Sequence, residues 1–187
     1  MKRELRNAVL NQMNDLGEQE HRELSKQIVT NAVKFLDSHP FKTIAVTLSR
    51  FPEVDTSLLI KHFWQQEKTV CVPKSDGSTK QMQFYKINSW SDIEPGYKGI
   101  LEPKVSSCES VAKSEIDCII VPGVVFTFSG YRIGFGGGFY DRYLEDYSGV
   151  TCSLLASLQL EEQLPIEQHD VAVQYLITEQ NIIKSGE

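Results

Sequence analysis

The alternation of strand and helix patterns between residues 42 and 72 is the feature that most constrains the fold of this chain. Residues 42–48 are mostly apolar and β-branched, as in a buried strand. Apolar residues then recur at helical spacing over 58–63, and 69–72 returns to a strand pattern. Two strands joined through a helix by short connections lie parallel in one sheet. The sequence therefore predicts an α/β fold of three layers, with helices on both faces of a largely parallel sheet.

The rest of the chain continues this pattern on both sides. Apolar stripes over 5–16 and 24–36, separated by Gly17, predict two opening helices. Residues 81–87 alternate with period two, as in a strand at the edge of the sheet. Residues 88–114 lack periodicity and predict a long irregular loop, of the kind that is often functional. The remaining predicted elements are strands at 117–121, 151–158 and 171–178, the last in the chain, and a helix at 140–147.

Composition and charge limit the number of domains and the kinds of ligand that we expect. The 187 residues are 41% hydrophobic, so we expect one domain spanning residues 1–187. The net charge of -6 gives no basic footprint for nucleic acid or an anionic membrane, so local cations must hold any anionic ligand. No apolar run approaches the roughly 20 residues that cross a bilayer, and the four cysteines form no CxxC pair. We expect a soluble, cytoplasmic monomer whose thiols are reduced and mostly buried.

The segment 121–144 carries the chemical information. A buried strand there leads into a loop with five glycines between Gly130 and Gly138, and the loop leads into a helix. Glycine tolerates positive φ and lets backbone N–H groups approach phosphate oxygens closely. However, GxxxxGK[ST] is absent, and the glycine spacing is not the GxGxxG of dinucleotide-binding folds. On spacing alone, phosphate binding and a tight structural turn are equally good interpretations.

Two charged residues favour the phosphate interpretation. Arg132 lies inside the loop and could neutralise an anion. Asp141 follows the loop, where a magnesium ion bound to phosphates would need a carboxylate ligand. Alternatively, Asp141 is an acid in the first turn of a helix, stabilised by the helix dipole. The two roles are compatible. Zinc and serine-nucleophile motifs such as HExxH and GxSxG are missing.

Several motifs along the chain together resemble the 5-formyltetrahydrofolate cyclo-ligase family, whose members are also called methenyltetrahydrofolate synthetases. The longest is RIGFGGGFYD at 132–141, preceded by Pro122-Gly123, Phe126 and Gly130. The others are KRELR at 2–6, Gly96-Tyr97-x-Gly99-Ile100-x-Glu102-Pro103 and His169-Asp170. The resemblance implies that ATP and Mg²⁺ drive conversion of 5-formyltetrahydrofolate, with or without a polyglutamate tail, into 5,10-methenyltetrahydrofolate. ADP and phosphate would be released through a phosphorylated formyl intermediate.

The resemblance also implies roles for individual residues. Asp141 would be the magnesium ligand and, with Arg132, catalytic. Leu48 would pack on the pterin, and Glu53 would accept hydrogen bonds from its amino and amide N–H groups. The ATP contacts would come from Lys2, Arg6, Arg132, Ile133, Gly134, Phe135, Gly136, Gly137, Gly138, Phe139 and Tyr140. Further substrate contacts would come from Phe135, Gly136, Gly137, Gly138 and Phe139.

Without the resemblance, these residues have plainer interpretations. Lys2 and Arg6 are solvated charges on one helix face, and Glu53 is an acid at the start of a helix. Three positions also depart from the family pattern. Thr127 stands where Asp is common, Gln174 where a second acidic metal ligand is expected, and Gly137 where some members carry lysine. Two alternatives therefore stay open: a related small-molecule kinase or ligase, and a nucleotide- or folate-binding module without turnover.

Overall fold

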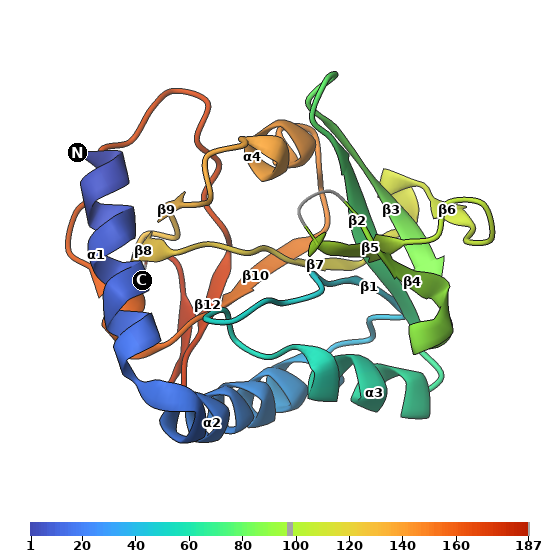
Figure 1. Ribbon diagram of the computed structural model, residues 1–187, viewed down its shortest axis with the longest axis horizontal. Coiled ribbons are helices and arrows are strands. Elements are labelled where there is room, and N and C mark those ends of the chain that lie inside the picture. Colours follow the sequence, from blue (N-terminus) through green and yellow to red (C-terminus); the bar gives the residue numbers. More distant parts are fainter. Residues whose placement is uncertain (97–98, 187) are drawn as a thin grey trace.

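An eight-stranded sheet, ordered β13-β12-β10-β7-β1-β2-β3-β6, organises the computed structural model, which describes residues 1–96 and 99–186 (Figure 1). Its central strands are parallel: β1 (Thr43–Ala45), β2 (Thr69–Asp76), β7 (Cys118–Ile120), β10 (Val150–Leu154) and β12 (Tyr175–Ile177). The outer strands pair antiparallel with their neighbours: β3 (Gln81–Ile87), β6 (Ser110–Val111) and β13 (Ile182–Lys184). The predicted α/β class with a largely parallel sheet is confirmed.

Helices pack on both faces of this sheet. Helices α2 (Gly17–Asp37) and α3 (Ser57–Gln65) cover one face, and α4 (Phe139–Leu144) lies against the other (Figure 1). Strand β1 contributes side chains to the core on both faces of the sheet. Ile44 belongs to the core cluster under α2 and α3, whereas Ala45 belongs to the cluster that contains Tyr143 of α4. Successive side chains of a strand point to opposite faces, so a continuous apolar run fits a strand that is covered twice.

The first helix, α1 (Lys2–Asp15), stands at one end of the sheet beside a small second sheet that the sequence did not predict (Figure 1). That sheet has the order β11-β8-β9, formed by Leu160–Glu161, Val125–Thr127 and Arg132–Ile133. Each of its strands has two or three residues, too few to produce a recognisable period. The small sheet matters for the site because β9 leads directly into the glycine-rich loop.

Other differences from the sequence predictions also involve short elements. The expected irregular loop 88–114 contains a hairpin of β4 (Ile93–Pro95) and β5 (Leu101–Pro103), followed by β6. Strand β6 pairs with the middle of β3, so β3 is not the edge strand. The predicted last strand is followed by β13. Tyr97 of the 96–103 motif lies outside the described residues. Short 3₁₀ helices span Trp90–Asp92, Lys113–Glu115 and Ser157–Gln159.

The cysteines were expected to be reduced and mostly buried. All four cysteines are free thiols, and three of them, Cys71, Cys118 and Cys152, are buried. The expectation that most of the thiols are buried is confirmed. Among the described residues, no helix combines the length and the apolar character that crossing a membrane requires.

Candidate active site

The loop between β9 and α4 presents its backbone to a ligand. Gly136 and Gly138 have φ values of +98° and +63°, in the region that residues with side chains rarely adopt. Within the described part of the chain, the N–H groups of Gly136, Gly137 and Gly138 donate no hydrogen bond to backbone or side-chain acceptors. Unpaired N–H groups on successive residues form a concave surface that suits an anion.

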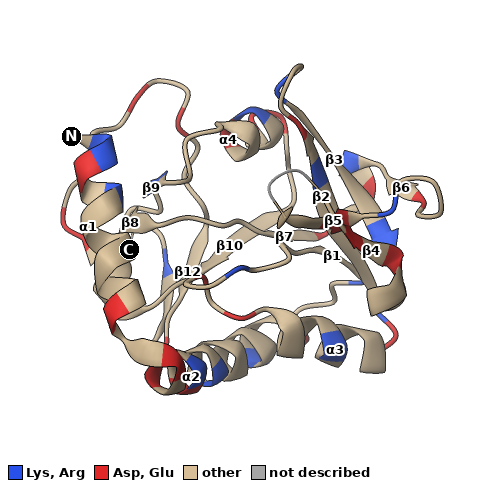
Figure 2. Cartoon of the chain, in the orientation of Figure 1, with Lys and Arg blue, Asp and Glu red and all other residues tan. Residues whose placement is uncertain are grey.

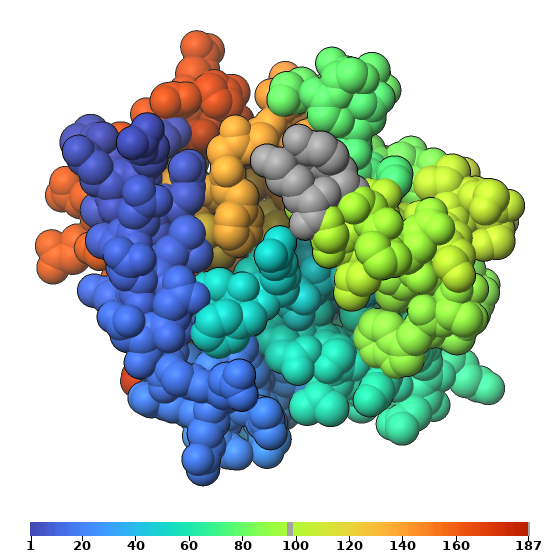
Figure 3. Space-filling model, viewed as in Figure 1, coloured from blue at the N-terminus to red at the C-terminus, as the bar shows by residue number. Residues whose placement is uncertain are grey.

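This loop forms one wall of a cavity of about 320 Å³. Figure 3 shows the loop in orange, exposed beside α1 in blue and above the segment near residue 50 in cyan. Basic residues at the start of α1 lie next to the small sheet (Figure 2). The structure thus brings together all the residues that the resemblance assigns to ATP. The cavity is lined by Lys2, Arg6, Arg132, Ile133, Gly134, Phe135, Gly136, Gly137, Gly138, Phe139, Tyr140 and Asp141, together with Ser75, Pro122, Glu167, His169 and Asp170.

Helix α1 is tied to the cavity through its two predicted cations. Arg6 Nε donates a hydrogen bond of 2.7 Å to the Gly134 carbonyl. Lys2 Nζ lies 2.9 Å from Asp170 Oδ2 and 3.4 Å from Glu167 Oε1. Partial burial alone would lower the pKa of Lys2, but the two carboxylates outweigh it and raise this pKa overall. The Lys2 ammonium therefore stays charged and is already paired, whereas among the described residues Arg6 has only a carbonyl partner.

A buried ion pair lies at the base of the same cavity. The Arg132 side chain is 3% exposed, and its Nη2 is 3.1 Å from Asp141 Oδ1. Its Nη1 donates to the Val171 carbonyl at 2.5 Å, and the Val171 N–H donates to the same Asp141 oxygen at 3.1 Å. Desolvation lowers the pKa of Arg132, and the Asp141 carboxylate opposes that shift. Arg132 thus holds Asp141 in place.

Asp141 can also bind a metal ion. Its Oδ1 is occupied by Arg132 and Val171, but its Oδ2 accepts no hydrogen bond from the described residues. Magnesium prefers one or two carboxylate oxygens plus water and phosphate oxygens. A cavity that offers one unengaged carboxylate oxygen and unpaired backbone donors fits that ion when it arrives with a polyphosphate. Both roles considered for Asp141, as an acid near a helix start and as a metal ligand, are compatible with this geometry.

The three departures from the family pattern have structural explanations. Gln174 Oε1 accepts a hydrogen bond of 3.1 Å from the Thr151 N–H, and Gln174 does not line the cavity. Thr127 is 3% exposed, with its hydroxyl 2.9 Å from that of Ser129. At Gly137, an added Cβ would lie 2.5 Å from the Phe139 ring, so a side chain fits only if this ring moves.

Glu53 lies in the connection between β1 and α3, close to this cavity. It lines a cavity of about 510 Å³ and a smaller one that it shares with Pro122, and Pro122 also lines the loop cavity. Burial raises the pKa of Glu53, opposed by a hydrogen bond of 2.8 Å that its Oε2 accepts from the Arg50 N–H. Leu48, the other residue expected at the pterin, is half-buried and packs against the core.

Tyr140 lines the loop cavity and lies close enough to Glu53 for the two groups to interact electrostatically. Its hydroxyl is buried and has no hydrogen-bond partner among the described residues. Burial, and after it the charge of Glu53, raise the pKa of Tyr140 far above its ordinary value, so the hydroxyl stays protonated. A buried hydroxyl without a partner is rare in folded proteins and suggests that a ligand supplies the missing acceptor.

Sequence reasoning missed several residues that shape the site. His21 of α2 is 8% exposed, and its Nε2 lies 3.1 Å from the Pro52 carbonyl and 2.9 Å from that of Glu53. It therefore fixes the backbone that carries the Glu53 carboxylate. A lone histidine in a helix gives no sequence signal for this role. Asp170 belongs to the His169-Asp170 motif, but its ion pair with Lys2 becomes visible only in the structure.

Comparison with known proteins identifies the family. The model of the 5-formyltetrahydrofolate cyclo-ligase family matches residues 1–179. The chain is 30% identical to 5-formyltetrahydrofolate cyclo-ligase of Escherichia coli K12, covering 87% of this chain and 92% of that protein. It is 25% identical to the mouse enzyme of the same name, covering 95% and 93% respectively.

Solved structures extend the likeness to the fold. The NMR structure of Aquifex aeolicus 5,10-methenyltetrahydrofolate synthetase matches with a TM-score of 0.87 at 34% identity, over 100% of this chain and 93% of that one. A synthetase of the same name from Mycoplasma pneumoniae matches with a TM-score of 0.78 at 25% identity, over 95% and 98%. Because the family model covers nearly the whole chain and the relatives agree in fold, this protein belongs to the 5-formyltetrahydrofolate cyclo-ligase family.

Proposed function

We propose that this protein uses ATP and Mg²⁺ to convert 5-formyltetrahydrofolate into 5,10-methenyltetrahydrofolate, with release of ADP and phosphate. One observation carries the proposal. The loop cavity combines unpaired backbone N–H groups, the Arg6 guanidinium and an Asp141 carboxylate oxygen. At Pro122 it adjoins a small cavity of about 30 Å³, which leads to the larger cavity at Glu53. A nucleotide and a folate can therefore meet near Pro122.

The nucleotide half depends on local charge, because the chain as a whole is acidic with a net charge of -6. Arg6 and the glycine N–H groups of 136–138 would bind the phosphate oxygens. Lys2 would contact them by turning from its carboxylate partners Glu167 and Asp170. Asp141 Oδ2 would hold Mg²⁺, which when bound neutralises charge on the phosphates. Arg132 acts as a positioning residue because its donors are directed to Asp141 and Val171.

The folate half depends on Glu53. Its carboxylate can accept two hydrogen bonds from the amino and amide N–H groups of the pterin. Burial of Glu53 disfavours the free carboxylate, and paired donors from a ligand would reverse that penalty. The unpartnered Tyr140 hydroxyl would donate to an acceptor on the bound ligand.

The chemistry needs no covalent protein nucleophile. The formyl oxygen attacks the γ-phosphorus of ATP, and the bond from this phosphorus to ADP breaks. N10 of the folate then attacks the activated formyl carbon and loses its proton. The bond from that carbon to the phosphate oxygen breaks, so that phosphate leaves with the proton as the ring closes. The protein contributes in-line positioning and stabilisation of charge on the transferring phosphoryl group.

The two alternatives lose their main support. A module without turnover was favoured by Thr127 and Gln174, but both side chains have partners elsewhere and neither lines the cavity. A related kinase or ligase for a different small acid would not need the Glu53 carboxylate beside the loop cavity. The folate ligase is therefore the function that the geometry supports best.

The test is a spectrophotometric assay for the conjugated methenyl product, with purified protein, 5-formyltetrahydrofolate, ATP and Mg²⁺. We expect product only when all three are present, and one ADP for each product. Folate binding by folded protein without product would identify a binding module. Hydrolysis of ATP that does not depend on the folate would indicate a different kinase or ligase.

A further inference from the structure

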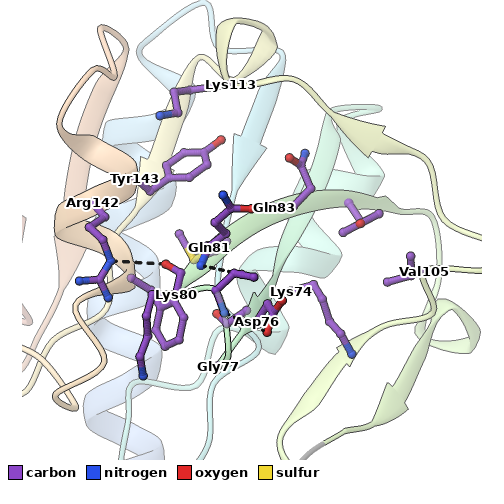
Figure 4. Close-up of a pocket in the computed structure, with 15 residues that line it drawn as sticks. Lys74, Asp76, Gly77, Lys80, Gln81, Gln83, Val105, Lys113, Arg142 and Tyr143 are labelled. Atoms are coloured by element: carbon purple, nitrogen blue, oxygen red, sulfur yellow. Dashed lines mark hydrogen bonds between the residues drawn. The ribbon is translucent and has the colours of Figure 1, made fainter.

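A second cavity, of about 940 Å³, adjoins the loop cavity on the far side of Phe139. It lies between the β2–β3 hairpin and α4 (Figure 4), and Ser75 and Phe139 line both cavities. We call it the basic cavity, because it is lined by the cations Lys74, Lys80, Lys113 and Arg142. The family resemblance assigns none of these four residues a role.

Two of the four cations are neutralised and two are not. Lys74 is paired with Glu102, and Lys113 with Asp146. Lys80 and Arg142 have no carboxylate partner among the described residues. Arg142 donates from Nε to the Lys80 carbonyl at 3.4 Å (Figure 4) and from Nη2 to the Gly137 carbonyl at 2.5 Å. These carbonyl groups are neutral and leave the charge of Arg142 uncompensated.

Among the described residues, Asp76 is the one acid that lines the basic cavity, and it forms no ion pair with Lys80 or Arg142. Asp76 Oδ1 accepts hydrogen bonds from the hydroxyl and N–H of Ser78 and from the N–H of Thr79. These bonds lower the pKa of Asp76 to about 2 and fix its carboxylate in the hairpin turn. Lys80 and Arg142 therefore lack an ion-pair partner among the described residues and are available to an anionic ligand.

Both unneutralised cations lie beside the wall between the two cavities. Lys80 Nζ is 5.8 Å and Arg142 Cζ 6.0 Å from the centre of the Phe139 ring.

The cavities follow one another in a row that matches the substrate. The cavity of about 510 Å³ at Glu53 meets a small cavity of about 30 Å³ at Ser49 and Glu53, and this small cavity meets the loop cavity at Pro122. The loop cavity in turn meets the basic cavity at Ser75 and Phe139. In 5-formyltetrahydrofolate the pterin is at one end, the formyl group is next to it, and a benzoylglutamate with two carboxylates forms the other end.

We propose that Lys80 and Arg142 bind the carboxylates of the glutamate end of the folate. This inference rests on the proposed function, because it takes the pterin to lie at Glu53. The order of the cavities then places the formyl group in the loop cavity, where the phosphates of ATP are expected. The phosphates themselves have Arg6 and the loop N–H groups on their own side of Phe139, so they do not need the basic cavity.

The test measures equilibrium binding by titration calorimetry with two ligands that differ only at this end. These are 5-formyltetrahydrofolate and 5-formyltetrahydropteroate, which has no glutamate. Wild-type protein should bind the folate more tightly. Lys80→Gln should weaken folate binding by about two- to five-fold, as expected for one partly exposed charge pair, and leave the pteroate unchanged. The folate advantage should shrink as salt is added.

Two further variants sharpen the test. Lys61→Gln removes an exposed cation from α3, on the opposite face of the sheet, and should change neither affinity. Lys80→Glu should weaken folate binding more than Lys80→Gln does. Equal affinity of wild-type protein for the two ligands, or equal losses for both in Lys80→Gln, would overturn the inference whether or not product forms. Absence of product alone would overturn the proposed function and leave this binding comparison standing.

Discussion

Replacing Asp141 by Asn separates a structural from a chemical role at one position. The substitution keeps an oxygen that can accept from Arg132 and Val171 but removes the charge that balances a guanidinium only 3% exposed. A hydrogen bond to a charged group contributes about 1.5–3 kcal/mol, against about 0.5–1.5 kcal/mol for a neutral pair. Breaking a fully buried pair costs about 3–5 kcal/mol, but Asp141 is 21% exposed and Asn keeps the geometry. We therefore expect a loss of about 2 kcal/mol.

Thermal unfolding followed by circular dichroism, without ligands, measures this loss. For a chain of 187 residues, about 2 kcal/mol corresponds to a fall in Tm of about 4–8 °C. The matched control is Asp146→Asn, which removes a 77% exposed partner of Lys113 and should shift the Tm by less than about 2 °C. An Asp141→Asn protein as stable as wild type would refute the stabilising role of the ion pair.

Turnover of the same variant tests the metal. Charge on the transferring phosphoryl group grows in the transition state, so loss of the metal carboxylate should lower kcat more than it weakens binding. We expect a fall of at least about a hundredfold, or about 2.7 kcal/mol, only partly rescued by excess Mg²⁺. Near-normal turnover at limiting Mg²⁺ would place the metal elsewhere.

Three further predictions concern Glu53, Arg6 and the loop. Glu53→Gln should weaken folate binding but not ATP binding in titrations. Because burial raises the pKa of Glu53, wild type loses stability as pH rises from the ordinary value of 4.5 through the raised one. Without ligand, the variant should therefore melt above wild type at pH 7 but not at pH 4. Arg6→Ala should raise the KM for ATP about tenfold and leave that for the folate unchanged, and equal changes would contradict the assignment. Gly136→Ala, at φ +98°, should lower the free energy of unfolding by about 1–3 kcal/mol. At Gly134 the φ is not in that region and a Cβ would meet open space, so Gly134→Ala should change the free energy of unfolding by less than about 1 kcal/mol.

Long elements with a regular period were predictable from the sequence. The stripe over 24–36 became part of α2, and the strand–helix–strand pattern at 42–72 became the parallel unit β1–α3–β2. Each of these patterns reports burial on one or both faces of a single element, which local sequence encodes. Strands of two or three residues, such as β6, β9 and β11, carry no such period. Partners elsewhere in the chain decide whether they form.

The candidate site also has one part that the sequence predicts and another that only the tertiary structure shows. The sequence by itself determined the contiguous loop 132–141, because glycine, arginine and aspartate at that spacing have local conformational and charge requirements. Only the tertiary structure decided their partners. Arg6 meets Gly134 across 128 positions and Lys2 meets Asp170 across 168, and the Arg132–Asp141 pair is completed by the Val171 backbone. Such contacts depend on how distant segments pack, because desolvation and distance set the energy of each charge, and neither quantity exists until the chain has folded.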